Sequence, residues 1–234
     1  MWMRITSGIL LGSSLLTGSD IHGTIQIERK LTRHNVTPSV GLYQRGASVE
    51  LGEDPVGDPL GFERSHVAVY IESGPGVPAS ARTKATIEQR DRRFAPDLVV
   101  VPAGSTVSFP NFDPIFHNVF SLSKPKSFDL GNYPKGQTRE VTFGTAGVVA
   151  VYCHLHSNMS ATILVSPTQW VARADSEGAF TLKGVPSGSY TVVAWHKAAG
   201  TFRRKVTVVE GKPLEISFTL PYVEPSIEKE SHHK

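Results

Sequence analysis

The sequence predicts an all-β fold built from two small β-sandwiches. Glycine and proline are frequent, with 21 and 16 residues in a chain of 234, and no stretch carries apolar residues at the helical spacing i, i+3, i+4, i+7. Short runs of alternating polar and apolar residues recur instead, separated by turn signals. Because the chain is longer than a typical single domain, we expect two domains of modest size.

Both ends of the chain are predicted to lie outside the folded part. Residues 1–19 have a charged start, an apolar core and small residues before Asp20, which is the pattern of a signal peptide. The apolar core is short and interrupted by Gly and Ser, so a cleaved signal is favoured over a membrane anchor. We therefore expect a periplasmic or otherwise exported protein. Residues 223–234 are polar without periodicity, which predicts a disordered tail.

The runs GTIQIE at 23–28 and HVAVYIE at 66–72 alternate as half-buried strands do, and we expect them to pair within one sheet. The segment between them is rich in Gly, Pro and charge, which predicts a long surface loop. Further strand-like runs follow at 85–89, 97–101, 106–110, 117–123, 138–143, 148–153 and 160–165. These seven strands are enough for one sandwich or barrel. Beyond Pro167, tight turns join short alternating strands, which predicts a second sandwich.

Charge gives little information about partners. The formal net charge is +3, a slight basic bias that could favour an acidic partner. The basic clusters at 90–93 and 203–205 lack the interleaved aromatic residues of a nucleic-acid surface, so nucleic acid is not an expected partner. Solvated strand faces are the simplest interpretation of both clusters.

The string VVAVYCHLHSNMSATILV carries the residues that point to chemistry. A predicted strand ends at Cys153, and the loop after it carries His156 and Met159. His117 opens an earlier strand, which antiparallel packing could bring beside the loop. A thiolate, two imidazoles and a thioether suit copper, because soft sulfur stabilises Cu(I) and imidazole serves both oxidation states. The chain has one cysteine, so an intramolecular disulfide cannot explain it.

Other interpretations of these residues fit the sequence less well. Cys153 alone could be an ordinary core residue. Zinc would leave Met159 without a role, because a thioether is a poor zinc ligand. A Cys–His nucleophile would need an exposed thiolate of low pKa and an oxyanion site, which the sequence does not mark. We therefore expect no enzyme activity and no catalytic residues.

The chain from about Thr83 to Val165 resembles the cupredoxin family, the blue-copper proteins such as plastocyanin and amicyanin. The resemblance rests on NFDPIFHNV and on GVVAVYC followed by the Cys-x2-His-x2-Met spacing, which is similar to that of amicyanin. It implies a Greek-key sandwich at 83–167, one mononuclear copper ion and single-electron transfer. The ligands it implies are His117, Cys153 and His156 in equatorial positions and Met159 in the axial one.

The resemblance also implies roles for neighbouring residues. Asn118 would hydrogen-bond between the two ligand-bearing segments. Partners in that family dock on an apolar patch around the C-terminal histidine ligand, which these residues could supply here: Pro114, Ile115, Phe116 and Leu155. Many relatives carry proline before that histidine, where this chain has Leu155. We expect the side chain of His154 to point away from Cys153 toward solvent. The physiological redox partner is not identified by the resemblance.

The flanking segments resemble the carboxypeptidase regulatory-like, transthyretin-type sandwich, on the string ARADSEGAFTLKGVPSGSYTVVAWH. Such modules begin with strands like those at 23–28 and 66–72. We therefore expect a discontinuous sandwich of residues 20–78 and 168–222 into which the cupredoxin domain is inserted. The combination resembles proteins described as methylamine-utilisation-like. The alternative to a carrier is a protein for copper storage or delivery, or a partner-binding protein with a non-shuttling copper site.

Residues outside the copper string are expected to have structural roles. His66 and His196 adjoin strands, and surface or capping positions are expected for both. Trp170 and Trp195 could form a sugar-binding surface, but packing in the core of a small sandwich is the commoner use of aromatic side chains.

Overall fold

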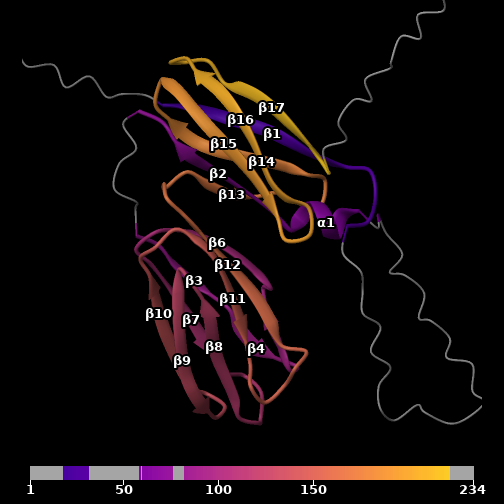
Figure 1. The fold of residues 1–234 in the computed structure, drawn as a ribbon, viewed down its shortest axis with the longest axis vertical. Coiled ribbons are helices and arrows are strands. Elements are labelled where there is room, and N and C mark those ends of the chain that lie inside the picture. Colours follow the sequence, from indigo (N-terminus) through magenta and orange to yellow (C-terminus); the bar gives the residue numbers. More distant parts are fainter. Residues whose placement is uncertain (1–17, 32–57, 59, 76–81, 222–234) are drawn as a thin grey trace, which may run out of the picture.

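The computed structural model describes residues 18–31, 58, 60–75 and 82–221 (Figure 1). Most of the predicted signal peptide 1–19, the middle of the predicted loop and the predicted tail 223–234 lie outside these residues. Within them, the elements are strands apart from one short helix, α1 (Gly61–Ser65), so the all-β prediction is confirmed. No helix of the described part is long and apolar enough to span a membrane.

A central sandwich is formed by the middle of the chain. Its strands are β3 (Lys84–Thr86), β6 (Leu98–Pro102), β7 (Ser105–Pro110), β8 (His117–Ser123), β9 (Lys126–Tyr133), β10 (Thr138–Phe143), β11 (Gly147–Tyr152) and β12 (Ser160–Ser166). One sheet has the order β6-β12-β11-β8-β9 and the other β10-β7-β3. The chain crosses between the sheets from β7 to β8 and from β9 to β10, as a Greek-key sandwich requires. A separate hairpin, β4 (Glu88–Arg90) with β5 (Arg93–Ala95), lies beside it.

The core of the central sandwich follows from strand alternation. Along β7, Val107 and Phe109 point inward and are fully buried. They meet Val119 of β8 and Val149 of β11 from the opposite sheet in one hydrophobic cluster. Each such side chain contributes about 1.5–3 kcal/mol on burial, so the cluster holds the two sheets together. Cys153 and Met159 belong to the same cluster, which places the predicted ligands at the margin of a rigid core.

A flanking sandwich is formed by strands from both parts of the chain around the central one. Its strands are β1 (Ser19–Ile27), β2 (Val67–Ser73), β13 (Val171–Arg173), β14 (Ala179–Val185), β15 (Gly188–His196), β16 (Gly200–Val208) and β17 (Leu214–Leu220). The sheets have the orders β14-β1-β17 and β13-β2-β15-β16, and apolar side chains from both sheets form a second core cluster. Trp170 is buried in this cluster as expected.

The early strands do not pair with each other, so that prediction is wrong. Strand β1 pairs antiparallel with β14 and parallel with β17, whereas β2 pairs antiparallel with β13 and β15 in the opposite sheet. Alternation identifies the buried face of a strand but not its partner, which explains the error. Both strands pair with strands beyond Pro167. The residue limits of the two domains stay a prediction.

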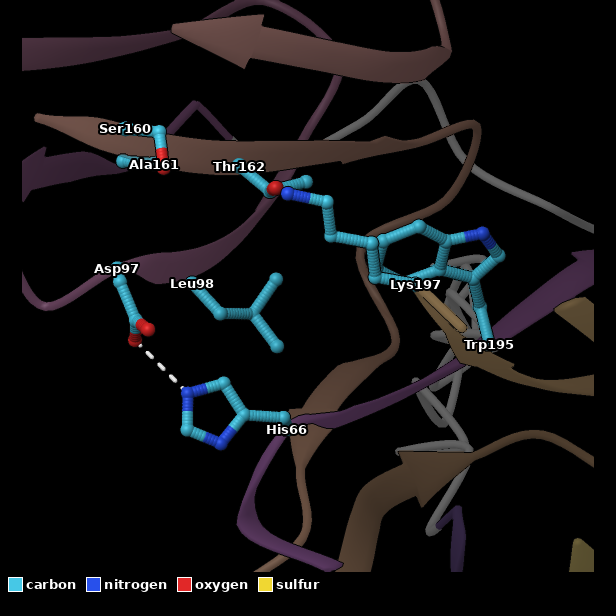
Figure 2. A pocket seen from close by; sticks show the side chains of 8 residues that line it. All are labelled: His66, Asp97, Leu98, Ser160, Ala161, Thr162, Trp195 and Lys197. Carbon is cyan, nitrogen blue, oxygen red and sulfur yellow. Dashed lines mark hydrogen bonds and ion pairs between the residues drawn. The ribbon is translucent and has the colours of Figure 1, made fainter. Parts of the chain in front are cut away.

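The two sandwiches are stacked along the longest axis of the molecule and contact each other directly (Figure 1). Arg173 of β13 donates a guanidinium hydrogen bond to the carbonyl of Leu98 in β6 at 3.4 Å. His66 Nε2, at the start of β2, lies 2.8 Å from Asp97 Oδ1 at the start of β6. Figure 2 shows this pair at the edge of a small pocket that Thr162, Trp195 and others line. Polar contacts therefore fix one sandwich against the other.

Of the surface or capping roles expected for His196, the structure shows a capping role in a buried position. Its side chain is 1% exposed, and its Nε2 lies 3.2 Å from the carboxylate of Glu63, which is also buried. Its Nδ1 accepts hydrogen bonds from the amides of Ala198 and Ala199. The neutral imidazole therefore carries its hydrogen on Nε2, the atom that lies near the Glu63 carboxylate.

Candidate metal centre

Two adjacent strands position the candidate ligands. His117 is the first residue of β8, and Cys153 follows directly after the last residue of β11. These strands are antiparallel neighbours, with Tyr152 opposite Phe120, so the start of one meets the end of the other. The loop after Cys153 then carries His156 and Met159 before β12 begins. Residues 36 positions apart in the chain are thereby brought to one end of the sheet.

The structure gathers three of the candidate ligands into one cluster. One donor atom each from His117, Cys153 and His156 lies within 4.8 Å of the other two. His117 Nδ1 is 3.2 Å from His156 Nδ1, and Cys153 Sγ is 3.8 Å from His156 Nδ1. Within the described ranges, it is the one group of three or more His, Cys, Asp or Glu side chains close enough to hold a metal ion.

Met159 lies beside this group. Its side chain is 1% exposed and belongs to the same core cluster as Cys153. Its amide donates a hydrogen bond to the carbonyl of His156 at 3.1 Å, which closes a tight turn in the loop. Met159 is thereby held in the same loop as His156.

A carboxylate orients the imidazole of His117. Asp113 Oδ2 lies 2.7 Å from His117 Nε2, and both side chains are buried. An ionised carboxylate can only accept, so Nε2 of His117 carries the hydrogen. The lone pair of this imidazole then resides on Nδ1, the atom that faces Cys153 and His156. A hydrogen-bonded carboxylate behind a histidine ligand is a common way to fix ligand orientation in metal sites.

Asp113 is itself held by the β4–β5 hairpin. The amides of Asp91 and Arg92 donate hydrogen bonds to its two oxygens at 2.7 and 2.9 Å. Both turn residues have positive φ, 54° and 55°, which turns their amides toward the carboxylate. Burial is the largest single influence on the pKa of Asp113 and raises it, but the bonds from these amides and His117 outweigh it. The pKa is therefore lowered, and the carboxylate stays charged.

Asn118 joins the two ligand-bearing segments, as the sequence led us to expect. Its amide N–H points at Cys153 Sγ at 3.5 Å, and its side-chain oxygen accepts from the amide of His154 at 3.4 Å. Its side-chain nitrogen donates to Asp129 Oδ1 at 2.6 Å. An N–H directed at the sulfur favours the thiolate form that binds metals.

His156 provides the more accessible donor. Its side chain is half-buried, whereas that of His117 is fully buried. Burial lowers the pKa of His156, and the neighbouring His117 and Arg92 lower it further. The neutral imidazole that a metal requires is therefore favoured. Two ring nitrogens 3.2 Å apart need a proton or a cation between them, because facing lone pairs repel each other.

His154 lies apart from this cluster. Its ring stacks on Phe120, with centroids 3.6 Å apart and planes 5° from parallel. Its Nε2 is 3.5 Å from Asp129 Oδ2, and the side chain is 54% exposed. The expected solvent-facing position of His154 is therefore confirmed.

Sequence reasoning missed the carboxylate and the hairpin behind His117. Asp113 lies in the quoted string NFDPIFHNV, four residues before His117, and a carboxylate so close to a candidate ligand was the available signal. No local pattern indicates that the amides of Asp91 and Arg92 reach Asp113, because they come from a separate hairpin.

Comparison with known families identifies part of the chain. A model of the carboxypeptidase regulatory-like domain matches residues 158–221. The match includes β13 to β17 of the flanking sandwich and also β12, which lies in the five-stranded sheet of the central sandwich. The expected resemblance of this segment is therefore confirmed. A comparison with curated protein sequences found no match.

Several solved structures resemble part of this chain. A copper-containing nitrite reductase from Thermus scotoductus SA-01 is 23% identical with a TM-score of 0.34, over 40% of this chain and 25% of the enzyme. A purple cupredoxin from Nitrosopumilus maritimus is 26% identical with a TM-score of 0.33, over 35% of this chain and 99% of that one. A Cu(I) amicyanin mutant is 19% identical with a TM-score of 0.34, over 43% of this chain and 99% of that one. Structural similarity at these TM-scores does not identify the family of this chain. The candidate metal centre therefore rests on the donor atoms of this chain alone.

Proposed function

We propose that this protein binds one copper ion and transfers single electrons in the cell envelope. The observation that carries the proposal is the convergence of donor atoms from His117, Cys153 and His156 within 4.8 Å, with the side chain of Met159 buried in the same core cluster as Cys153. A thiolate, two imidazoles and a weak thioether, without a carboxylate among them, match the ligand preferences of copper. The four residues would therefore hold the ion.

A copper ion held by such donors supplies a one-electron couple between Cu(I) and Cu(II). The chain's own contribution is to keep the donors in place during electron transfer. Asp113 fixes the ring of His117, Asn118 ties the loop to β8, and the core cluster packs around Cys153. Cys153 is 5% exposed, so the protein also keeps bulk water away from the sulfur. Rigid donors reduce the rearrangement that accompanies each electron.

An apolar surface around His156 supports a role in partner docking. Phe116 and Leu155, which precede the two histidine ligands, are 56% and 48% exposed, and Ile115 is 39% exposed. Large exposed apolar side chains that gather in one place favour a protein contact. We infer that an electron enters and leaves through His156 while a redox partner covers these side chains.

The remaining features of the proposal rest on the sequence. The signal pattern of residues 1–19 supports export, and the site offers no nucleophile with an oxyanion hole, which supports a carrier without enzyme activity. The flanking sandwich then serves as a structural or docking module.

The visible absorption spectrum after addition of Cu(II) tests the proposal. We expect an intense thiolate-to-copper charge-transfer band that is absent in Cys153→Ala, together with a reversible redox couple and fast self-exchange. Glu215→Gln serves as a control, because Glu215 is exposed on β17 of the flanking sandwich. Absence of the band in the unaltered protein would refute the electron carrier. Binding of Cu(I) alone, with ready transfer to a chelator, would indicate copper storage or delivery instead.

A further inference from the structure

The arginines of the β4–β5 hairpin lie next to the metal centre rather than on a remote strand face. The carbonyl of Arg92 lies 3.5 Å from Asn158 Nδ2, and Asn158 belongs to the loop that carries His156 and Met159. The amide of Arg92 also donates to Asp113, the carboxylate that orients His117. The hairpin is therefore part of the surface through which His156 is reached.

A second contact joins the hairpin to the apolar surface. The guanidinium of Arg90 lies 4.5 Å from the ring centroid of Phe112, a cation–π distance. Phe112 is 40% exposed and begins the segment that contains Ile115 and Phe116. These exposed residues together are called the docking face: Phe112, Ile115, Phe116 and Leu155 with Arg90, Arg92 and Arg93.

The charges of the docking face are not fully balanced. Residues 88–93 carry three arginines against the carboxylates of Glu88 and Asp91. Glu88 lies 3.4 Å from Arg90, and the nearby carboxylate of Asp113 is buried and already accepts three hydrogen bonds. Arg92 and Arg93 are exposed, and within the described residues neither forms an ion pair. Positive charge therefore remains available at the rim of the apolar patch.

We infer that the redox partner is a protein whose docking surface carries carboxylates around an apolar centre. This inference rests on the proposed function, because it names the partner of the same site. Aromatic and arginine side chains are enriched in protein interfaces, where the apolar part supplies affinity and the charges steer the encounter. Carboxylates on the partner would pair with Arg92 and Arg93, while apolar side chains cover Phe116 and Leu155.

Charged small-molecule oxidants test the electrostatic field that the arginines produce at the copper centre. Hexacyanoferrate(III) is anionic and tris(phenanthroline)cobalt(III) is cationic, so their rates of oxidising the Cu(I) protein respond oppositely to local charge. In the double variant Arg92→Glu, Arg93→Glu we expect the anionic oxidant to react about tenfold more slowly at low ionic strength and the cationic one faster. The matched control is Lys124→Glu, Lys126→Glu, which changes the same charge at the other end of β8 and β9.

This experiment distinguishes a failure of the acidic-partner inference from a failure of the proposed function. Equal rate changes in the arginine and lysine variants, or no change in either, overturn the acidic partner while the charge-transfer band stays intact. A protein without that band overturns the proposed function and, with it, this inference.

A copper-independent measurement adds a second test. Amide chemical shifts of the protein before copper addition are followed during titration with poly-L-aspartate, with poly-L-lysine as the control polymer. We expect poly-L-aspartate to shift residues 90–93 and 112–116 more than the basic cluster at 203–205, because Arg203 there is already paired with Glu72 at 2.8 Å. Equal or larger shifts at 203–205 overturn the inference.

Discussion

His66 Nε2 and Asp97 Oδ1 lie 2.8 Å apart and join the flanking sandwich to the central one. The other ring nitrogen of His66 lies 2.7 Å from the carbonyl oxygen of Phe62. Both partners are acceptors, and only the imidazolium offers an N–H to each of them. The geometry therefore favours the charged form of His66 at the contact between the sandwiches (Figure 2).

This pair predicts a dependence of stability on pH. Burial is the largest influence on the pKa of His66 and lowers it, and Arg173 acts in the same direction, but the bonds to Asp97 and Phe62 outweigh both and raise it above 6.5. The hydrogen bond from His66 lowers the pKa of Asp97 below 3.8. The stabilisation by His66 is complete below pH 6.5 and is lost as the pH rises through the raised pKa. The contribution of Asp97 is present above pH 3.8 and is lost as the pH falls through its lowered pKa.

We therefore expect the pair to stabilise the protein most between the two ordinary values, pH 3.8 and 6.5. The measurement is the free energy of unfolding of the unaltered protein minus that of His66→Gln, at about pH 5 and about pH 8. The difference should be under about 1 kcal/mol, because Asp97 is half exposed, and larger at the lower pH. A difference that grows toward alkaline pH contradicts the assignment.

Asp113→Asn should weaken copper binding by about 10- to 100-fold, because the carboxylate that orients His117 is lost. Asparagine retains one of the two oxygens that accept from the hairpin amides, so folding should persist. Copper affinity is measured by competition with a chelator, and ¹⁵N chemical shifts of His117 before copper addition report which ring nitrogen carries the hydrogen. Unchanged affinity together with an unchanged tautomer would rule out this role for Asp113.

Met159→Leu separates the packing role of Met159 from its role as a ligand. The substitution conserves volume in a side chain that is 1% exposed, so the loss in stability should stay below about 1.5 kcal/mol. Removal of a donor stabilises Cu(I) relative to Cu(II), so the reduction potential should rise. Voltammetry of the copper-loaded protein gives this shift, and an unchanged potential would show that the thioether does not contact the metal.

Phe116→Ser and Leu155→Ser should slow electron exchange between protein molecules while the charge-transfer band stays the same. The side chains of Phe116 and Leu155 are 56% and 48% exposed and adjoin the histidine ligands. They therefore contribute to contact between protein molecules rather than to folding. Leu122→Ser is the matched control, since Leu122 is 82% exposed at the far end of β8. Self-exchange rates measured by NMR line broadening decide the matter, and an equal effect of all three substitutions argues against a docking patch.

His196→Ala should destabilise the flanking sandwich by about 1–3 kcal/mol, because it removes a neutral polar neighbour of the buried carboxylate of Glu63. Burial lowers the pKa of His196, so this cost persists at neutral pH. Chemical denaturation measures it. His22→Ala is the comparison, since His22 contacts only the hydroxyl of Thr181 among the described residues and should cost about 1 kcal/mol or less. Similar losses for both variants would contradict the importance of the buried pair.

The sequence predicted individual strands well where alternation was regular. The runs 117–123 and 138–143 coincide with β8 and β10, because a period of two depends only on neighbouring residues. The run 85–89 was expected to be one strand, but it divides into β3 and β4, which belong to different sheets. Strand β9 was not predicted, since Asp129 and Gly131, with a φ of 64°, interrupt its apolar pattern.

The sequence by itself determined which donor residues this protein offers, and the tertiary structure decided how they are positioned. The types of the donor residues and the short spacing from Cys153 to Met159 are local properties, so they indicated copper before any fold was known. Strand partners, the carboxylate behind His117 and the arginines beside His156 depend on residues distant in the chain. Their positions follow from sheet pairing and burial across the whole molecule, which no local pattern encodes.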